Sequence, residues 1–212
     1  MAPRVSLPGE LGAAFTVARA VELGVGPRRL WGSDLERPFW GVRAAAGTLT
    51  DLPSLARAYS VRMPRHAFFS HATAARLWAI PLPPPLQSEI PLHVAVPHPR
   101  RAPESAGIAG HRLEIASADV STVFGLPVTS IERTVLDLAS LLDDEQLLGA
   151  LDNILWRRRS AASRATRASI VARPCRSTGR RGKSRVIELL PLATDRSDSL
   201  PESVIRLRFI RA

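Results

Sequence analysis

The segment LPVTSIERTVLDLA, at residues 126–139, constrains the fold of this chain more than any other part of it. Pro127 and Val128 favour an extended backbone, and Thr129 and Glu132 have the T-x-x-E spacing of a capping box. The helix that follows carries one apolar face, formed by Ile131, Val135, Leu138 and Leu142 with Leu136 and Ala139 beside it. This pattern predicts a strand that runs directly into a buried helix.

Two further segments come earlier in the chain: FSHATAARLWAIPLP at 69–83 and PLHVAVP at 91–97. Together and in this order, the three segments resemble the antitoxin family of AbiE-type (AbiEi-like) type IV toxin–antitoxin systems, over nearly the whole chain. None of the three is catalytic, so the resemblance identifies a scaffold. It implies a transcription regulator that binds operator DNA and represses its own operon. It also implies a functional link to a nucleotidyltransferase toxin that the antitoxin counters without direct contact.

Composition and length favour a folded protein of one large domain or two small ones. The chain has 212 residues, and its apolar fraction of 45% is ordinary for a globular protein. No window approaches the roughly 18 consecutive apolar residues that a membrane-spanning helix needs, and the first residues lack a signal-peptide pattern. The sequence therefore predicts a soluble, cytoplasmic protein with no membrane partner, and the family resemblance implies a bacterial one.

The net charge of +10 is concentrated in one part of the chain. Residues 157–187 carry ten arginines and Lys183 with no acid, which amounts to +11, so all other residues together sum to −1. This local basicity favours an interdomain linker or a solvated helix over 157–184, ahead of a dedicated phosphate-binding arm. Even a linker of this charge would raise non-specific affinity for DNA.

Residues 11–48 are predicted to form a small winged helix-turn-helix. Phe15 and Thr16 open the first helix, Gly24-Val25-Gly26 makes the turn, and Pro27 suits the first position of a second helix. The residues alone fit equally well an α-hairpin that does not touch DNA. The family resemblance favours DNA, because members of the family place a winged helix at this point.

The second helix of this motif is predicted to end near Asp34, and residues 38–43 are predicted to form an edge strand or wing. In such motifs the second helix enters the major groove, and the residues that flank the wing meet phosphates. The predicted contacts with duplex DNA are Arg28, Arg29, Trp31, Arg37 and Arg43.

Residues 49–156 are predicted to form an α/β domain, a three-stranded sheet packed by helices, which makes the whole chain an α+β protein. The strands are predicted as a half-buried strand over 92–96, a stretch ending at 115, and residues 120–124. Ser70 is predicted to cap one helix and Asp143 with Gln146 another, while the Pro-rich run at 81–91 excludes regular structure.

Residues 195–212 resemble the first helix of the Vsr-like nuclease domain that many relatives carry, and Glu202 matches a glutamate of that helix. The nuclease needs an acid-x-Lys element, but Lys183 is the only lysine and Arg181 stands two residues before it. The segment 185–212 is therefore interpreted as the truncated start of such a domain, and the protein as not an enzyme. Two alternatives stay open: a remnant of a Vsr-like endonuclease without its catalytic core, and a module that recruits a partner through its C-terminal helix.

The histidines are predicted to be structural. The closest pairs are five residues apart, a spacing that places two side chains on neither one face of a helix nor one side of a strand. The five are His66, His71, His93, His98 and His111. No metal site, no cofactor and no catalytic residue is therefore predicted.

Overall fold

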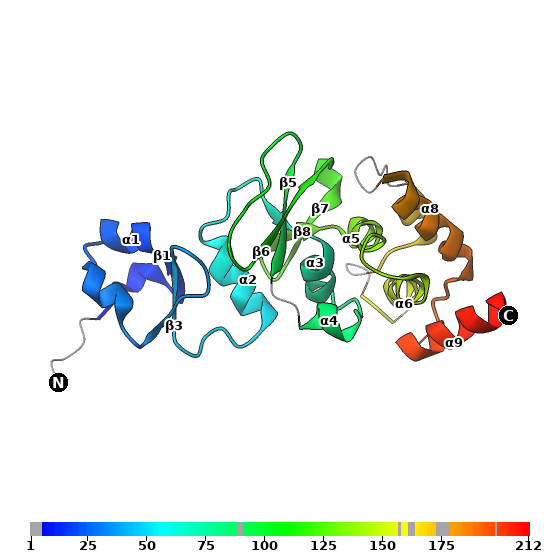
Figure 1. The fold of residues 1–212 in the computed structure, drawn as a ribbon, viewed down its shortest axis with the longest axis horizontal. Helices are drawn as coiled ribbons and strands as arrows, with labels where there is room; N and C mark the ends of the chain where they lie inside the picture. Colours follow the sequence, from blue (N-terminus) through cyan, green and yellow to red (C-terminus); the bar gives the residue numbers. More distant parts are fainter. Residues whose placement is uncertain (1–5, 89–90, 157, 161–163, 173–178, 198) are drawn as a thin grey trace. The chain divides into compact units, whose positions relative to one another are not determined.

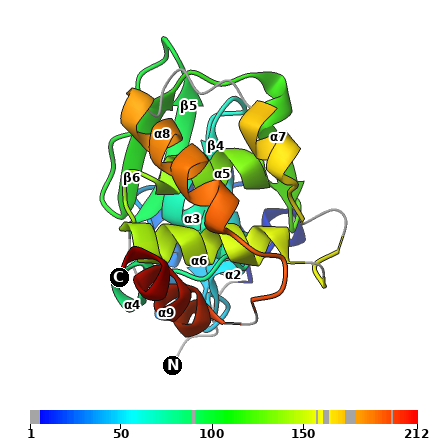
Figure 2. The same ribbon diagram turned by 90° about the vertical axis from the view of Figure 1, so that its right-hand side faces the viewer.

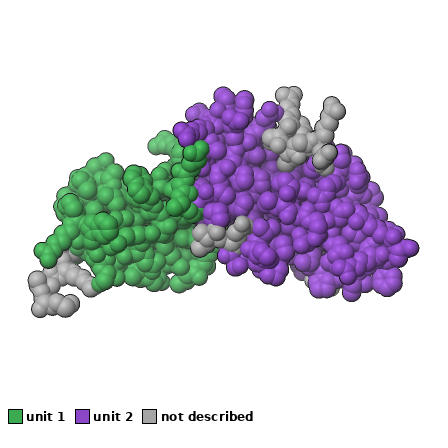
Figure 3. All heavy atoms as spheres, viewed as in Figure 1, with its two compact units in different colours: residues 1–66, 104–107 green, residues 67–103, 108–212 purple. Residues whose placement is uncertain are grey.

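A computed structural model describes residues 6–88, 91–156, 158–160, 164–172, 179–197 and 199–212. The chain divides into two compact units, coloured separately in Figure 3. The first comprises residues 1–66 with 104–107, and the second comprises residues 67–103 with 108–212. Each unit combines helices with its own sheet, so the fold is α+β as predicted (Figure 1).

The first unit is built on a three-stranded antiparallel sheet in the order β1-β3-β2. Its strands are β1 (Ala14–Thr16), β2 (Leu35–Glu36) and β3 (Val42–Ala45). Its helical elements are the 3-10 turn η1 (Gly9–Leu11), α1 (Val17–Glu22), the 3-10 helix η2 (Pro27–Trp31) and α2 (Leu52–Ser60). A small apolar core joins η1, β1, α1, η2 and β2, and it is formed by Leu11, Phe15, Ala20, Val25, Leu30 and Leu35.

Three details of the first unit differ from the prediction. Where an edge strand or wing was predicted over 38–43, residues 38–41 lie outside any strand and β3, which follows, is the central strand of the sheet. Phe15 lies in β1, and α1 begins only after Thr16, whose side chain accepts a hydrogen bond from the Arg19 amide at 3.1 Å. The second helix is a five-residue 3-10 helix. It lies between Gly26 and Gly32, and backbone amides donate hydrogen bonds to the carbonyl oxygens three residues earlier. A segment as short as this suits 3-10 geometry.

The first unit extends to residue 66. Helix α2 belongs to it, because this helix packs on β1 and β3. Asp51 caps this helix by accepting a hydrogen bond from the Ser54 amide at 2.8 Å.

The second unit contains a five-stranded mixed sheet in the order β6-β5-β4-β8-β7, in place of the predicted three strands. The strands are β4 (Phe68–Phe69), β5 (Leu92–Pro97), β6 (Ile108–Leu113), β7 (Val120–Val123) and β8 (Leu126–Thr129). Strands β5 and β6 pair in parallel, as do β4 and β8, while β4–β5 and β7–β8 are antiparallel. The predicted strands are β5, β6 and β7, and the sheet is completed by β4 and by the strand of the 126–139 segment.

Strand β5 is buried on both faces, whereas the alternation predicted a half-buried strand. Ala95 packs with Phe68 and Leu113 in a small apolar cluster, and helix α3 (His71–Leu77) packs against the strand. His93 is buried on the same side of the strand as Ala95. The buried polar side chain of His93 therefore gave the sequence the alternating pattern of a half-buried strand.

Helix caps in the second unit confirm one prediction and correct another. Helix α6 (Asp144–Leu155) has the predicted capping box, with the Gln146 amide donating to Asp143 Oδ1 at 2.8 Å. Helix α5 (Ile131–Leu138) is capped by Ser130 and not by Thr129, which is the last residue of β8. In the Pro-rich run, α4 (Pro84–Gln87) forms a single helical turn where no regular structure was expected.

The C-terminal segment packs on α5 and α6 within the second unit. It contains α7 (Arg167–Ala172), α8 (Gly179–Leu189), the 3-10 turn η5 (Leu190–Leu192) and α9 (Leu200–Arg211). Helix α9 lies beside α6 (Figure 2). Helix α9 approaches α6 so closely at Gly149 that a Cβ atom added there would lie only 2.1 Å from Leu200 Cδ1.

Two arginines of the basic segment are bound to the ends of earlier helices. Arg185 donates to the carbonyl oxygens of Ala139 and Leu142, just after α5, at 2.6 and 2.9 Å. Arg159 donates to the carbonyl oxygen of Trp78, just after α3. A helix ends with carbonyl groups that lack partners within the helix, and a guanidinium group satisfies them. Within 157–184, Arg159 is thus held by the folded unit, while the predictions for 157, 161–163 and 173–178 lie outside the described residues.

Candidate functional site

Two tryptophans of the first unit expose their rings to solvent. Trp31 ends η2 and is 63% exposed, and Trp40 lies in the turn between β2 and β3 and is 80% exposed. Both line a groove of about 720 Å³. The groove is also lined by Thr16, Val17, Ala18, Arg37, Phe39, Gly41, Arg43 and Arg62. Large aromatic rings left in solvent at one place are typical of a binding surface.

An arginine guanidinium group lies over each of these two rings. The Arg37 guanidinium lies 4.1 Å from the Trp31 ring centre, and that of Arg62 lies 5.5 Å from the Trp40 ring centre. Arg62 also donates to the Trp40 carbonyl oxygen at 2.8 Å, and Arg37 to that of Trp31 at 3.4 Å. Cation–π attraction and these hydrogen bonds hold the guanidinium groups at the surface of the groove.

Arg43 belongs to the interior of the unit. Its side chain is 8% exposed, and it donates to the carbonyl oxygens of Leu30 and Val42 at 2.8 and 2.9 Å. Burial, and secondarily the charge of Arg37, lowers the pKa of Arg43 from its ordinary value. Arg43 therefore ties η2 to β3 and supports the Trp31 ring, whose centre lies 5.6 Å from its guanidinium carbon.

The other two predicted DNA contacts differ in their surroundings. Arg28 is exposed on η2, whereas Arg29 is half-buried and forms a bidentate pair with Asp34, at 3.0 and 2.6 Å. The structure thus brings Trp31, Arg37 and Arg43 to one groove. Sequence reasoning missed Arg62, because it follows α2 and nothing in the local pattern links it to the wing.

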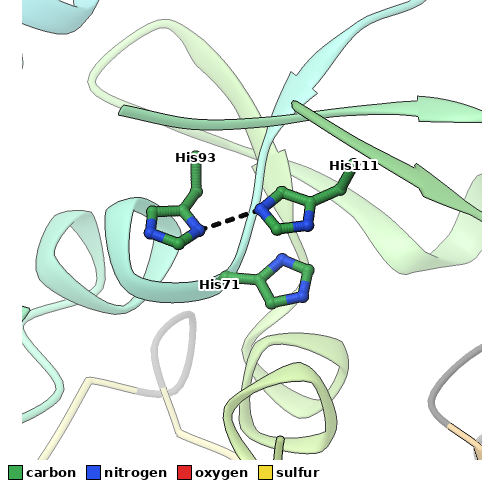
Figure 4. Close-up of side chains that lie close together, drawn as sticks. All are labelled: His71, His93 and His111. Carbon is green, nitrogen blue, oxygen red and sulfur yellow. Dashed lines mark hydrogen bonds between the residues drawn. The ribbon is translucent and has the colours of Figure 1, made fainter. Parts of the chain in front are cut away.

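A second group of side chains gathers in the other unit, where His71, His93 and His111 meet (Figure 4). Each offers one ring nitrogen, and the three nitrogens lie within 4.8 Å of one another. His93 Nδ1 and His111 Nε2 are 2.9 Å apart, and the rings of His71 and His111 stack with their centres 3.9 Å apart. Among the residues described, these three histidines form the group whose ligand atoms lie close enough together to hold a metal ion.

Local hydrogen bonds place these histidines. The Ser70 amide donates to the His93 carbonyl oxygen at 3.1 Å, and the His93 amide donates to Thr73 Oγ1 at 2.8 Å, so α3 begins against β5. His71 is the first residue of α3 and has a φ of 48°, a left-handed conformation that few non-glycine residues adopt. Its Nδ1 lies 3.0 Å from Ser70 Oγ, and this contact takes the Ser70 side chain away from capping the helix.

The electrostatics of the cluster favour uncharged imidazoles. Burial, helped by the neighbouring histidines, lowers the pKa of His71 to about 2 and that of His111 to about 4. The nearby guanidinium of Arg133 contributes to the shift at His71, and it is paired with Asp137, whose Oδ1 lies 2.9 Å from Arg133 Nε. The spacing of the histidines along the sequence gives no sign of this cluster, because the parallel pairing of β5 and β6 creates it.

No helix among the described residues is both long enough and apolar enough to cross a membrane.

The class that the fold defines is an α+β protein with a three-stranded antiparallel sheet in one unit and a five-stranded mixed sheet in the other. Among solved structures, the RV2827C protein from Mycobacterium tuberculosis has a similar fold, with a TM-score of 0.51 and 16% sequence identity. The match covers 94% of this chain and 90% of that one. At this identity the likeness concerns the fold alone. No protein-family model matches the chain, and no curated protein matches it either.

Proposed function

We propose that this protein is a DNA-binding transcription regulator and that its first unit acts as a winged helix-turn-helix on duplex DNA. The observation that carries the proposal is the groove where the exposed rings of Trp31 and Trp40 stand with three guanidinium groups around them. Arginines held against aromatic rings are poised to meet phosphates, and the rings offer apolar surface to sugars and bases.

Each part of the unit would have its own role. The turn at Gly24 separates α1 from η2, and η2 would present Arg28 to the major groove. The β2–β3 hairpin would act as the wing, with Arg37 and Trp40 in its connecting turn. Arg62 would add a phosphate contact beside the wing, and Arg43 would hold η2 in place from within.

The resemblance to AbiE-type antitoxins supports the further proposal that the protein represses its own operon and counters a nucleotidyltransferase toxin. In that scheme the protein acts by binding DNA and is not an enzyme. A gene for a nucleotidyltransferase next to the gene for this chain is the expected genomic arrangement. Its absence would leave the DNA-binding proposal in place and remove the antitoxin one.

The test is a titration of a fluorescent duplex from the region upstream of the gene, followed by anisotropy. Arg37→Gln and Arg62→Gln should each weaken binding and reduce the slope of log affinity against log salt by about 1, as expected for a lost phosphate contact. Arg28→Ala should cost about 1–3 kcal/mol if it reads a base. Arg19→Gln is the matched control, because Arg19 is exposed in the same unit and paired with Glu22 at 3.1 Å.

Equal affinity of the wild type and of the Arg37 and Arg62 variants would show that the groove is not the DNA interface. Tighter binding to single strands than to the duplex would contradict the helix-turn-helix assignment, because exposed aromatic rings also stack on unpaired bases. Quenching of tryptophan fluorescence by DNA, lost in Trp31→Phe and Trp40→Phe together, would place the nucleic acid at the groove. Trp78 and Trp156 belong to the second unit and serve as the unquenched background.

A further inference from the structure

We propose that His71, His93 and His111 together bind one divalent transition-metal ion of the Zn²⁺ class. The site lies in the second unit, so this proposal does not depend on DNA binding by the first. The ion would be held by three imidazole nitrogens, a donor set that suits Zn²⁺, Co²⁺ or Ni²⁺ and not Mg²⁺ or Ca²⁺.

The first support is the spacing of the donor atoms. In a tetrahedral site with Zn–N bonds of about 2.0–2.1 Å, two ligand nitrogens lie about 3.3 Å apart. His93 Nδ1 and His111 Nε2 are hydrogen-bonded at 2.9 Å, so the ion would replace the proton between them after a small separation of the two rings. The nitrogen of His71 lies within 4.8 Å of both.

The second support is that the three ligands come from three elements fixed by hydrogen bonds. His93 and His111 stand on the paired strands β5 and β6, two positions apart in register, since Ala95 is the direct partner of His111. His71 begins α3, whose start is bound to β5 through the Ser70 and His93 backbone. Ligands carried by rigid elements lose little conformational freedom when they bind an ion.

The third support is the burial of the ligands, which lie inside the fold with one side open to solvent. His71 and His93 are buried while His111 is half-buried, so solvent can reach the ion from the side of His111. Three protein ligands with one position left for water is the arrangement of zinc sites that bind or activate a small molecule.

Besides the small separation of His93 from His111, ion binding requires a rotation of the His71 ring. The planes of the His71 and His111 rings are 19° apart, and those of His93 and His111 are 8° apart, so the rings are nearly parallel. The His71 ring must turn about its side-chain bonds until the lone pair of its ring nitrogen points at the same ion position as those of His93 and His111. The stacking of His71 on His111 would then be replaced by bonds to the ion.

The experiment is a titration of the metal-free full-length protein with Co²⁺, followed by visible absorption, and then with Zn²⁺ by calorimetry. We expect one equivalent of Co²⁺ to give the strong absorption of a four-coordinate ion, and Zn²⁺ to displace it. His93→Gln and His111→Gln should abolish this signal. His66→Gln and His98→Gln are the matched controls, because both residues are exposed and lie outside the cluster, and they should bind like the wild type.

A retained signal in His111→Gln, or no uptake of either ion at one equivalent by the wild type, would overturn the proposal. Circular dichroism of the metal-free variants checks that they are folded. If His93→Gln does not fold, X-ray absorption at the metal edge of the wild-type complex decides the question without a variant. Three imidazole ligands around the ion support the site, and fewer than three rule it out.

Discussion

Arg133 and Asp137 form an ion pair in the interior of the second unit, with side chains only 1% and 0% exposed. Arg133 Nη1 also donates to the Glu114 carbonyl oxygen at 2.9 Å, so the guanidinium spans from α5 to the chain just after β6. Burial raises the pKa of Asp137 to about 7, and the charge of Arg133 opposes that shift. A buried charge is tolerated only while its partner is present, which makes this pair sensitive to the loss of one member.

Asp137→Leu should therefore lower the free energy of unfolding by about 3–5 kcal/mol, because it leaves the Arg133 guanidinium buried without its counter-ion. The double variant Arg133→Met with Asp137→Leu should be more stable than Asp137→Leu alone, since both buried charges are then removed. Urea unfolding followed by circular dichroism measures both. A double variant that is no more stable than Asp137→Leu alone would contradict this account of the pair.

At the scale of elements, the C-terminal helices are bound to α6 and its surroundings by charged groups as well as by apolar contacts. Asp144, the first residue of α6, accepts hydrogen bonds from Arg211 of α9 and Arg185 of α8, at 2.7 and 2.8 Å. Glu145 accepts from Arg208 of α9 at 2.7 Å. Both C-terminal helices are thus bound to the start of α6, and α9 is also bound farther along it through Arg206 and Asp152.

These bonds make the attachment dependent on pH. The hydrogen bonds from Arg211 and then Arg185 lower the pKa of Asp144 below its ordinary 3.8. A carboxylate whose pKa is lower in the folded state adds stability above its ordinary pKa, and that stability is lost as the pH falls through the folded value. Asp144→Asn should cost about 1 kcal/mol or less at neutral pH, since the pair is partly exposed.

The difference between the wild type and Asp144→Asn should shrink as the pH falls below 3.8, as measured by urea unfolding at a series of pH values. Glu188→Gln, a change at an exposed acid of α8, is the control and should show no such trend. A difference that stays constant down to the lowest pH would assign the loss to packing and not to charge.

Local patterns predicted the elements whose signal is contained in consecutive residues. The Asp143–Gln146 box placed the start of α6, and the apolar positions of 92–96 placed β5. Strand β4 could not be predicted, because two residues are too few for an alternation. The packing of α9 on α6 and the meeting of the three histidines depend on contacts between distant segments, which no local spacing encodes.

At the scale of the whole molecule, the two units carry different chemistry. The first holds the groove with two tryptophans and three arginines, and the second holds the histidine cluster. The net charge of +11 over residues 157–187 lies in the second unit. Arg159 and Arg185, however, donate hydrogen bonds to backbone carbonyl groups. Part of the charge that a sequence reading assigns to DNA is therefore structural.

We expect the whole protein to leave DNA intact. Nucleases that use Mg²⁺ hold the ion with carboxylate oxygens, which it prefers as ligands. The acid-x-Lys element of such nucleases cannot form at Lys183, the single lysine of the chain, because Arg181 stands two residues before it. Glu202, the residue that matches the opening helix of Vsr-like nucleases, is exposed on α9.

Supercoiled plasmid incubated with the protein and Mg²⁺ or Mn²⁺ should stay supercoiled, as judged on an agarose gel. Nicking by the wild type that is lost in Glu202→Gln and kept in Glu188→Gln would identify the protein as a nuclease.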